Sequence, residues 1–346
     1  GTKTMLSGIP IPKDAVRPPE TVLVNITPQE TRVAVLEENN ICELHIERNS
    51  GHSLVGNIYL GMVRRVLPGM QSAFIDIGLE RAAFLHIVDV LEQRRNPDET
   101  QRIEHMLFEG QSVLVQVIKD PINTKGARLS TQISLAGRFL VHLPQEDHIG
   151  ISQRIEDDAE RNSLRERLTN LLPEDACHGY IIRTNAENAT DEQLLSDIHY
   201  LTKVWEHIQE QAKTQPPETL LYQDLPLSLR VLRDMFSLDT QKILVDSTEN
   251  HRRMTRFAEQ YVHGALGKIE LFKGERPLFE THNVEQEISR ALQPRVNLNF
   301  GSYLIIESTE AMTTIDVNTG GFVGARNFDE TIFRTNLEAC HTIARE

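Results

Sequence analysis

Three short runs rich in β-branched and other apolar residues lie near the start of the chain, at 21–27, 31–36 and 41–47. Short runs of this kind, bounded by turn residues, are typical of strands. Pro28-Gln29 and Asn39-Asn40 separate the runs and suit tight turns. The pattern predicts a β-meander, which is too short to bury both of its faces and needs other elements to cover it.

Five further strand-like runs follow, at residues 54–66, 70–77, 81–87, 112–119 and 127–134, with Gly or Pro between several of them. Five short strands within about eighty residues predict a small barrel of the OB type. Beyond the barrel, residues 135–220 show strand and helix patterns, and their second helix is expected to stop before Pro216-Pro217. We expect strands at 135–143 and 179–183, and helices at 157–172 and 191–213.

The remaining residues predict mixed α/β structure. Helices are expected at 228–236, at 249–261, from a cap at Asn283 to a point before Pro294, and at 329–346. Strands are expected at 242–245, 295–299 and 302–307, followed by a strand that carries Asp316.

Composition narrows the classes of function. The formal net charge of -14 over 346 residues argues against indiscriminate nucleic-acid binding by the whole surface, and it is compatible with a local basic site. Cys42, Cys177 and Cys340 form no CxxC pair and no zinc spacing, which favours a reducing, cytoplasmic location. No apolar run is long enough to span a membrane. Residues 1–20 read as a tag or N-terminal extension.

Two phenylalanines of the expected barrel lie on polar strand faces. Phe74 shares a face with Asp76, and Phe84 shares a face with His86, whereas the apolar residues beside them point the other way. Lys125 and Arg128 of a later strand are expected near them. Exposed rings beside a cation are what a platform for single-stranded RNA requires, because bases stack on the rings and the cation binds phosphate. The alternative is that one ring is buried at an end of the barrel.

Two strand ends carry candidate chemistry. Asp316 and Asn318 share a strand face, and a carboxylate beside an amide oxygen suits Mg²⁺. The alternative is a strand end stabilised by Asx hydrogen bonds before Gly320-Gly321. Arg183 and Thr184 end another strand, where guanidinium and hydroxyl donors suit a phosphate. The alternative there is that both side chains are merely solvated.

Six motifs occur in order along the chain: GNIY at 56–59, LPGMQSAFIDIG at 67–78, AAFLH at 82–86, TKGARLS at 124–130, IIRT at 181–184 and EAMTTIDVNTG at 310–320. With them the chain resembles the bacterial RNase E/G endoribonucleases, and residues 67–71 and 83–86 are more similar to RNase G. The resemblance covers nearly the whole chain from about residue 21, and several motifs in register make it highly specific.

The resemblance implies an α+β multidomain fold. An RNase H-like subdomain would comprise residues 21–50 and 221–290, with an OB-fold RNA-binding β-barrel at 51–132 inserted into it. Residues 133–220 would form a sensor for a 5′-monophosphate. Residues 291–346 would form a truncated DNase I-like α/β catalytic subdomain.

The resemblance also implies residue roles and an activity. The activity is Mg²⁺-dependent hydrolysis of single-stranded RNA, with a preference for 5′-monophosphorylated ends, in rRNA maturation and mRNA turnover. The matched residues are Phe74, Phe84 and Lys125 for RNA contact, Gly137, Val141, Arg183 and Thr184 for the 5′-phosphate, and Asp316 and Asn318 for catalysis, with Asp316 also a metal ligand.

Two departures from the family pattern bear on this expectation. The family's second catalytic aspartate and its zinc-binding cysteine pair would both fall after Glu346, so Zn²⁺ and a homo-oligomer are expected only for a longer chain. The family's NIYKG motif has Leu60 in place of lysine, which removes one positive charge. Two hypotheses remain: an endoribonuclease that acts on RNA and not on DNA, and a catalytically incomplete RNA-binding module.

Overall fold

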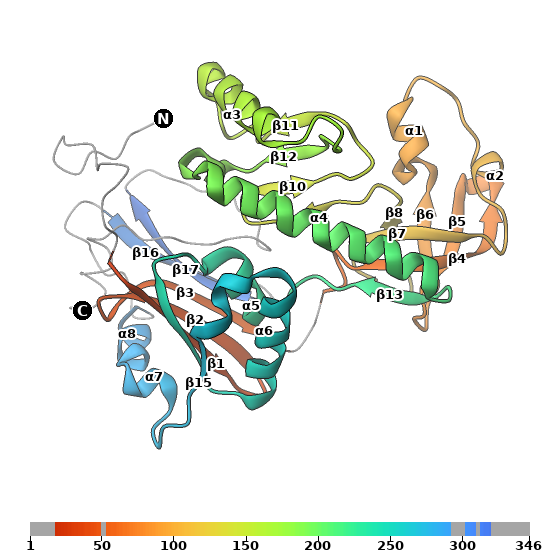
Figure 1. Cartoon of the computed structure of the whole chain (residues 1–346). Coiled ribbons are helices and arrows are strands. Elements are labelled where there is room, and N and C mark those ends of the chain that lie inside the picture. Colours follow the sequence, from red (N-terminus) through yellow and green to blue (C-terminus); the bar gives the residue numbers. More distant parts are fainter. Residues whose placement is uncertain (1–17, 50–52, 292–301, 309–311, 320–346) are drawn as a thin grey trace. The chain divides into compact units, whose positions relative to one another are not determined.

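The computed structural model describes residues 18–49, 53–291, 302–308 and 312–319, which form a mixed α+β structure. The chain divides into two compact units, one made of residues 1–52 and 225–346 and the other of residues 53–224 (Figure 1). No helix in the described part of the chain is long and apolar enough to cross a membrane. The expected strand at 295–299 and the expected helix at 329–346 lie outside the described residues.

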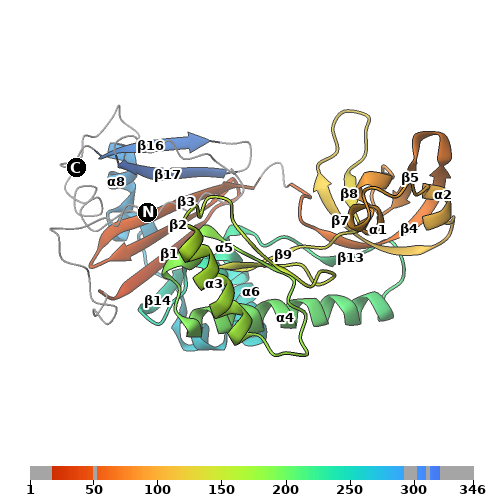
Figure 2. The same ribbon diagram turned by 90° about the horizontal axis from the view of Figure 1, so that it is seen from above.

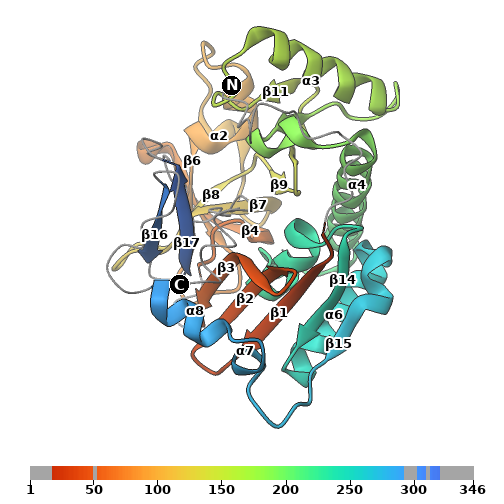
Figure 3. The ribbon, with the colours of Figure 1, turned by 90° about the vertical axis from the view of Figure 1, so that its left-hand side faces the viewer.

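A seven-stranded sheet forms the centre of the first unit, in the order β15-β14-β1-β2-β3-β17-β16 (Figure 3). The antiparallel β1, β2 and β3 confirm the predicted meander, and β14 and β15 extend it as parallel strands. The strands are β1 (Glu20–Ile26), β2 (Glu30–Glu37), β3 (Asn40–Arg48), β14 (Thr240–Val245), β15 (Ile269–Leu271), β16 (Ser302–Ser308) and β17 (Met312–Thr319).

Helices cover both faces of this sheet, as the short meander requires. Val22 and Val24 of β1 pack in one core with α5 (Leu227–Arg230), the π-helical turn that follows it and α6 (Thr248–Tyr261). Leu23 points to the opposite face and packs in a second core with α7 (Leu278–Thr281) and α8 (Val284–Ala291). Alternate residues of one strand therefore build two cores.

Five strands of the second unit form a closed barrel, in the order β4-β5-β6-β8-β7, which confirms the predicted barrel and is consistent with an OB-like fold (Figure 2). The barrel closes because the first half of β4 pairs with β7 and its second half pairs with β5. A strand that the sequence pattern did not predict, β13, also pairs with β4. The elements are β4 (Ile58–Leu67), β5 (Ser72–Asp76), β6 (Ala83–His86), α1 (Leu91–Arg95), α2 (Ile103–Met106), β7 (Ser112–Lys119), β8 (Arg128–Ser130) and β13 (Thr219–Tyr222).

A four-stranded sheet, in the order β11-β12-β10-β9, forms the rest of the second unit together with α3 and the long α4. The single strand expected at 135–143 is wrong, because a turn at residues 137–139 divides it into β9 and β10. The short β11 was not predicted. The elements are β9 (Leu135–Ala136), β10 (Leu140–His142), β11 (Ile149–Ile151), α3 (Asp158–Leu171), β12 (Tyr180–Ile182) and α4 (Asp191–Thr214).

Candidate functional site

Phe74 and Phe84 lie outside the barrel core, as the alternation along their strands predicts. Ile75 and Leu85 are fully buried in that core, whereas both phenylalanines are half-buried on the other face. The two phenylalanines are directly paired across β5 and β6, and their ring centroids lie 6.3 Å apart in an edge-to-face arrangement. The alternative that one ring fills an end of the barrel is therefore excluded.

The strand register extends these rings into a row that crosses the barrel. Arg65 of β4 pairs with Phe74, Phe74 pairs with Phe84, and Phe84 pairs with Arg128 of β8. Arg128 in turn pairs with Lys119 of β7. Paired residues share a face, so these five residues form one cross-strand row with two rings flanked by cations. Arg65 and Lys119 are exposed.

A buried carboxylate holds Arg128 in this row. Asp89 is buried, and its Oδ2 accepts a hydrogen bond of 2.8 Å from Nε of Arg128. The backbone carbonyl of Asp89 also accepts hydrogen bonds from the Ser130 hydroxyl and the Thr131 backbone N–H. Asp89 thus fixes both the end of β8 and the guanidinium group beside Phe84.

Lys125 is exposed on the loop that precedes β8. The backbones of Ile122 and Lys125 exchange two hydrogen bonds and make a tight hairpin. The next residue must be glycine, because a Cβ on Gly126 would lie 2.0 Å from the carbonyl oxygen of Ala82. This close approach brings Lys125 to the beginning of β6, the strand that carries Phe84.

The four residues expected to bind a 5′-phosphate come from the turn at residues 137–139, from β10 and from the two positions after β12. Nη1 of Arg183 donates a 2.7 Å hydrogen bond to the carbonyl of Gly137. Val141 pairs with Ile181, two residues before Arg183. Thr184 is exposed, and its hydroxyl oxygen lies 3.3 Å from that of Ser152. We call Gly137, Val141, Arg183 and Thr184 the clamp.

A buried aromatic pair supports the sheet behind the clamp. The rings of His142 and Tyr180 stack with centroids 4.5 Å apart, and Nδ1 of His142 lies 2.9 Å from the carbonyl oxygen of Gly179. Burial lowers the pKa of His142, and burial raises the pKa of Tyr180 to about 12. Both rings are therefore neutral near pH 7, and they form a rigid, uncharged support for β10 and β12.

Asp316 and Asn318 both lie on β17, as the sequence predicts. Asp316 pairs with Ile305 of β16, and Thr314 pairs with His45 of β3. The side chains of β17 lie outside the described part, so the catalytic role of the two residues stays a prediction. No group of three or more His, Cys, Asp or Glu side chains could hold a metal ion elsewhere among the described residues.

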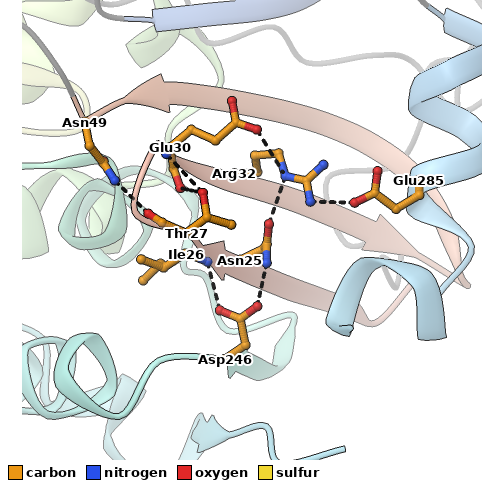
Figure 4. Close-up of polar contacts among 8 residues, drawn as sticks. All are labelled: Asn25, Ile26, Thr27, Glu30, Arg32, Asn49, Asp246 and Glu285. Carbon is orange, nitrogen blue, oxygen red and sulfur yellow. Dashed lines mark hydrogen bonds and ion pairs between the residues drawn. The ribbon is translucent and has the colours of Figure 1, made fainter. Parts of the chain in front are cut away.

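A polar network in the first unit connects β1, β2 and α8 (Figure 4). Asp246 follows β14 and accepts hydrogen bonds from the backbone N–H of Ile26 (2.8 Å) and from Nδ2 of Asn25 (2.6 Å). Arg32 donates from Nε to Oδ1 of Asn25 (2.9 Å) and from Nη2 to Glu285 (2.5 Å). The carboxylates are engaged by donors of the chain itself, so we interpret the network as structural.

Comparison with known proteins agrees with the motifs. Residues 134–346 match the model of the Ribonuclease E/G family. Ribonuclease G of Salmonella typhimurium (strain SL1344) is 46% identical over 332 residues, which cover 94% of this chain and 68% of that protein. The chain belongs to the ribonuclease E/G family.

The chain is more similar to ribonuclease G than to ribonuclease E. Ribonuclease G of Escherichia coli (strain K12) is 45% identical, with 94% of this chain and 68% of that protein covered. Ribonuclease E of Nostoc sp. (strain PCC 7120 / SAG 25.82 / UTEX 2576) is 39% identical over 325 residues, with 93% and 47% covered. The greater likeness to ribonuclease G, expected from residues 67–71 and 83–86, is confirmed.

Sequence reasoning missed Arg65, Lys119 and Asp89 as members or supports of the barrel row. Arg65 and Lys119 are charged residues that belong to none of the six motifs. Only the register of β4, β7 and β8 brings them into line with the two rings.

Proposed function

We propose that this chain forms the RNA-binding and catalytic region of an endoribonuclease of RNA processing and decay, which hydrolyses phosphodiester bonds in single-stranded RNA. The observation that carries the proposal is the cross-strand row of two rings flanked by exposed cations, in a chain of the ribonuclease E/G family. Stacked bases contribute about 1–3 kcal/mol each to binding. The cations at the two ends of the row would bind the backbone phosphates that flank the stacked bases.

The catalytic residues that we propose are Asp316 and Asn318, whose oxygen donors suit Mg²⁺. The ion would lower the pKa of a bound water and neutralise charge on the scissile phosphate. Asp316 would hold the ion through its carboxylate, and the Asn318 amide would orient the scissile phosphate for attack.

The clamp is proposed to give a preference for RNA with a 5′-monophosphate. Arg183 supplies a planar fork of donors, and its Nη1 is already held by the Gly137 carbonyl, so the guanidinium is oriented before RNA binds. The exposed hydroxyl of Thr184 supplies a further directed donor. A triphosphate is larger and more highly charged, and a compact pair of donors disfavours it.

The finer fold assignments belong to the same proposal. Residues 51–132 would be an OB-fold, residues 21–50 with 221–290 an RNase H-like subdomain, and residues 291–346 part of a DNase I-like subdomain. We also propose a cytoplasmic location and, for the full-length protein, a homo-oligomer.

The test uses the protein at its full native length and a labelled single-stranded RNA with either a 5′-monophosphate or a 5′-hydroxyl. We expect internal cleavage with Mg²⁺, no cleavage with excess EDTA, and faster cleavage of the monophosphorylated RNA. For the chain of residues 1–346 alone, a stable complex without cleavage in Mg²⁺ would support the catalytically incomplete RNA-binding module. Equal cleavage in EDTA would contradict the metal dependence.

A further inference from the structure

A buried aspartate organises the turn behind the clamp. Asp197 is on α4 and only 5% exposed. Its Oδ1 accepts a hydrogen bond from the backbone N–H of Arg138 at 2.8 Å, and its Oδ2 accepts hydrogen bonds from those of Phe139 and Leu140, each at 2.9 Å. One carboxylate thus fixes three successive peptide units, and hydrogen bonds to an ionised acceptor are stronger than neutral ones.

The same carboxylate explains the glycine before this turn. A Cβ on Gly137 would lie 2.4 Å from Oδ1 and 2.7 Å from Oδ2 of Asp197, which is closer than real contacts allow. Positive φ angles occur elsewhere in the described chain but not at Gly137, so its backbone conformation does not require glycine. Residue 137 must be glycine because a larger side chain would occupy the space that the Asp197 carboxylate fills.

The turn holds Arg183 through both its side chain and its backbone. The Gly137 carbonyl accepts the hydrogen bond from Nη1 of Arg183, and the Phe139 carbonyl accepts a 2.9 Å hydrogen bond from its backbone N–H. Any shift of the turn would therefore move the guanidinium. A contiguous path runs from Asp197 through the turn to Arg183.

We propose that Asp197 is a positioning residue for recognition of a 5′-terminal phosphate, and that Gly137 serves this site by making room for the Asp197 carboxylate. This inference rests on the proposed preference for 5′-monophosphorylated RNA. Asparagine at 197 keeps the size of the side chain but has one acceptor oxygen and adds two donors, so at least one turn N–H loses its partner.

The experiment measures the Kd of two single-stranded RNAs that differ only in a 5′-monophosphate or 5′-hydroxyl end. In Asp197→Asn we expect the preference for the monophosphate to fall about tenfold while affinity for the 5′-hydroxyl RNA stays unchanged. Glu206→Gln removes one charge from an exposed position of the same helix and should leave both constants unchanged. Circular dichroism and thermal unfolding confirm that each variant is folded.

Two results separate the inference from the function on which it rests. Equal affinity of the wild-type protein for both RNAs would overturn the proposed preference, and with it the role of Asp197. A wild-type preference that persists in Asp197→Asn would overturn the role of Asp197 alone.

A second variant acts on the turn without removing the carboxylate. Gly137→Ala should lower the 5′-monophosphate preference as Asp197→Asn does, because its methyl group displaces the turn. In a protein that already carries Asp197→Ala, Gly137→Ala should alter the 5′-monophosphate preference less than about twofold. The carboxylate oxygens that would collide with the added methyl group are then absent. An equal loss in both backgrounds would show that Gly137 acts on the phosphate directly and would overturn the assigned role.

Discussion

The barrel row and the clamp, the two regions that we propose bind RNA, hold their side chains in two different ways. Phe74 and Phe84 need no hydrogen bonds, because the alternate residues Ile75 and Leu85 are fully buried and fix their strands. Arg183 instead depends on directed hydrogen bonds to backbone carbonyls of a turn, and that turn depends on Asp197.

The difference agrees with what we propose each region recognises. Every base has a π-face, so a stacking platform needs only rings at the right spacing, and strand register provides that. One terminal phosphate must be distinguished from a hydroxyl, which requires donors at fixed positions. Changes in the row should therefore weaken binding of every RNA, and changes in the clamp should alter only the preference for one end.

The largest expected effect lies outside both binding regions. In the full-length protein, Asp316→Asn should lower the cleavage rate on the order of 10³-fold while RNA affinity stays nearly unchanged, because in the proposed mechanism the carboxylate would stabilise the transition state rather than the bound ground state. Single-turnover cleavage and filter binding on the same RNA measure the two quantities. A large loss of affinity would mean that Asp316 supports the RNA-binding fold instead.

Removal of a stacking ring should have the next largest effect. Phe74→Ala or Phe84→Ala should weaken binding of both the 5′-monophosphate and the 5′-hydroxyl RNA by about 1–3 kcal/mol, with little change in unfolding temperature. The matched control is Ile75→Ala in the core, which should cost about 2–5 kcal/mol of stability. A cooperative loss of structure in either phenylalanine variant would contradict the placement of these rings outside the barrel core.

Arg183→Lys tests the clamp with the charge kept. Lysine has no planar fork and cannot both bond the Gly137 carbonyl and present paired donors to a phosphate. We expect the preference for the 5′-monophosphate to fall about tenfold, roughly 1.4 kcal/mol, with affinity for the 5′-hydroxyl RNA unchanged. Equal weakening for both RNAs would place Arg183 in general RNA binding and remove the contrast between the two regions.

The sequence predicted those parts of the molecule that depend on local pattern. Short apolar runs between turn residues were sufficient for the meander and the barrel strands, and alternation was sufficient to place Phe74 and Phe84 on the face opposite the barrel core. The division of the expected strand 135–143 could not be predicted, because it depends on Asp197, which lies 57 to 59 residues later in the chain. The sequence could place Arg183 and Thr184 at a strand end, but only the structure shows that the Gly137 carbonyl holds the guanidinium.

The smallest expected effect tests whether the row extends beyond its two rings. Arg65→Ala and Lys119→Ala should each weaken binding of both RNAs a few-fold, and each should reduce the slope of log Kd against log salt by about 0.7, the value expected when one contact to a single-stranded phosphate is lost. Lys213→Ala removes an exposed cation at the end of α4 and should leave the slope unchanged. An unchanged slope in both row variants would confine RNA binding to the aromatic pair and its nearest cations. A lower 5′-monophosphate preference in either variant would instead couple the row to the clamp, and the two regions could then no longer be treated as independent.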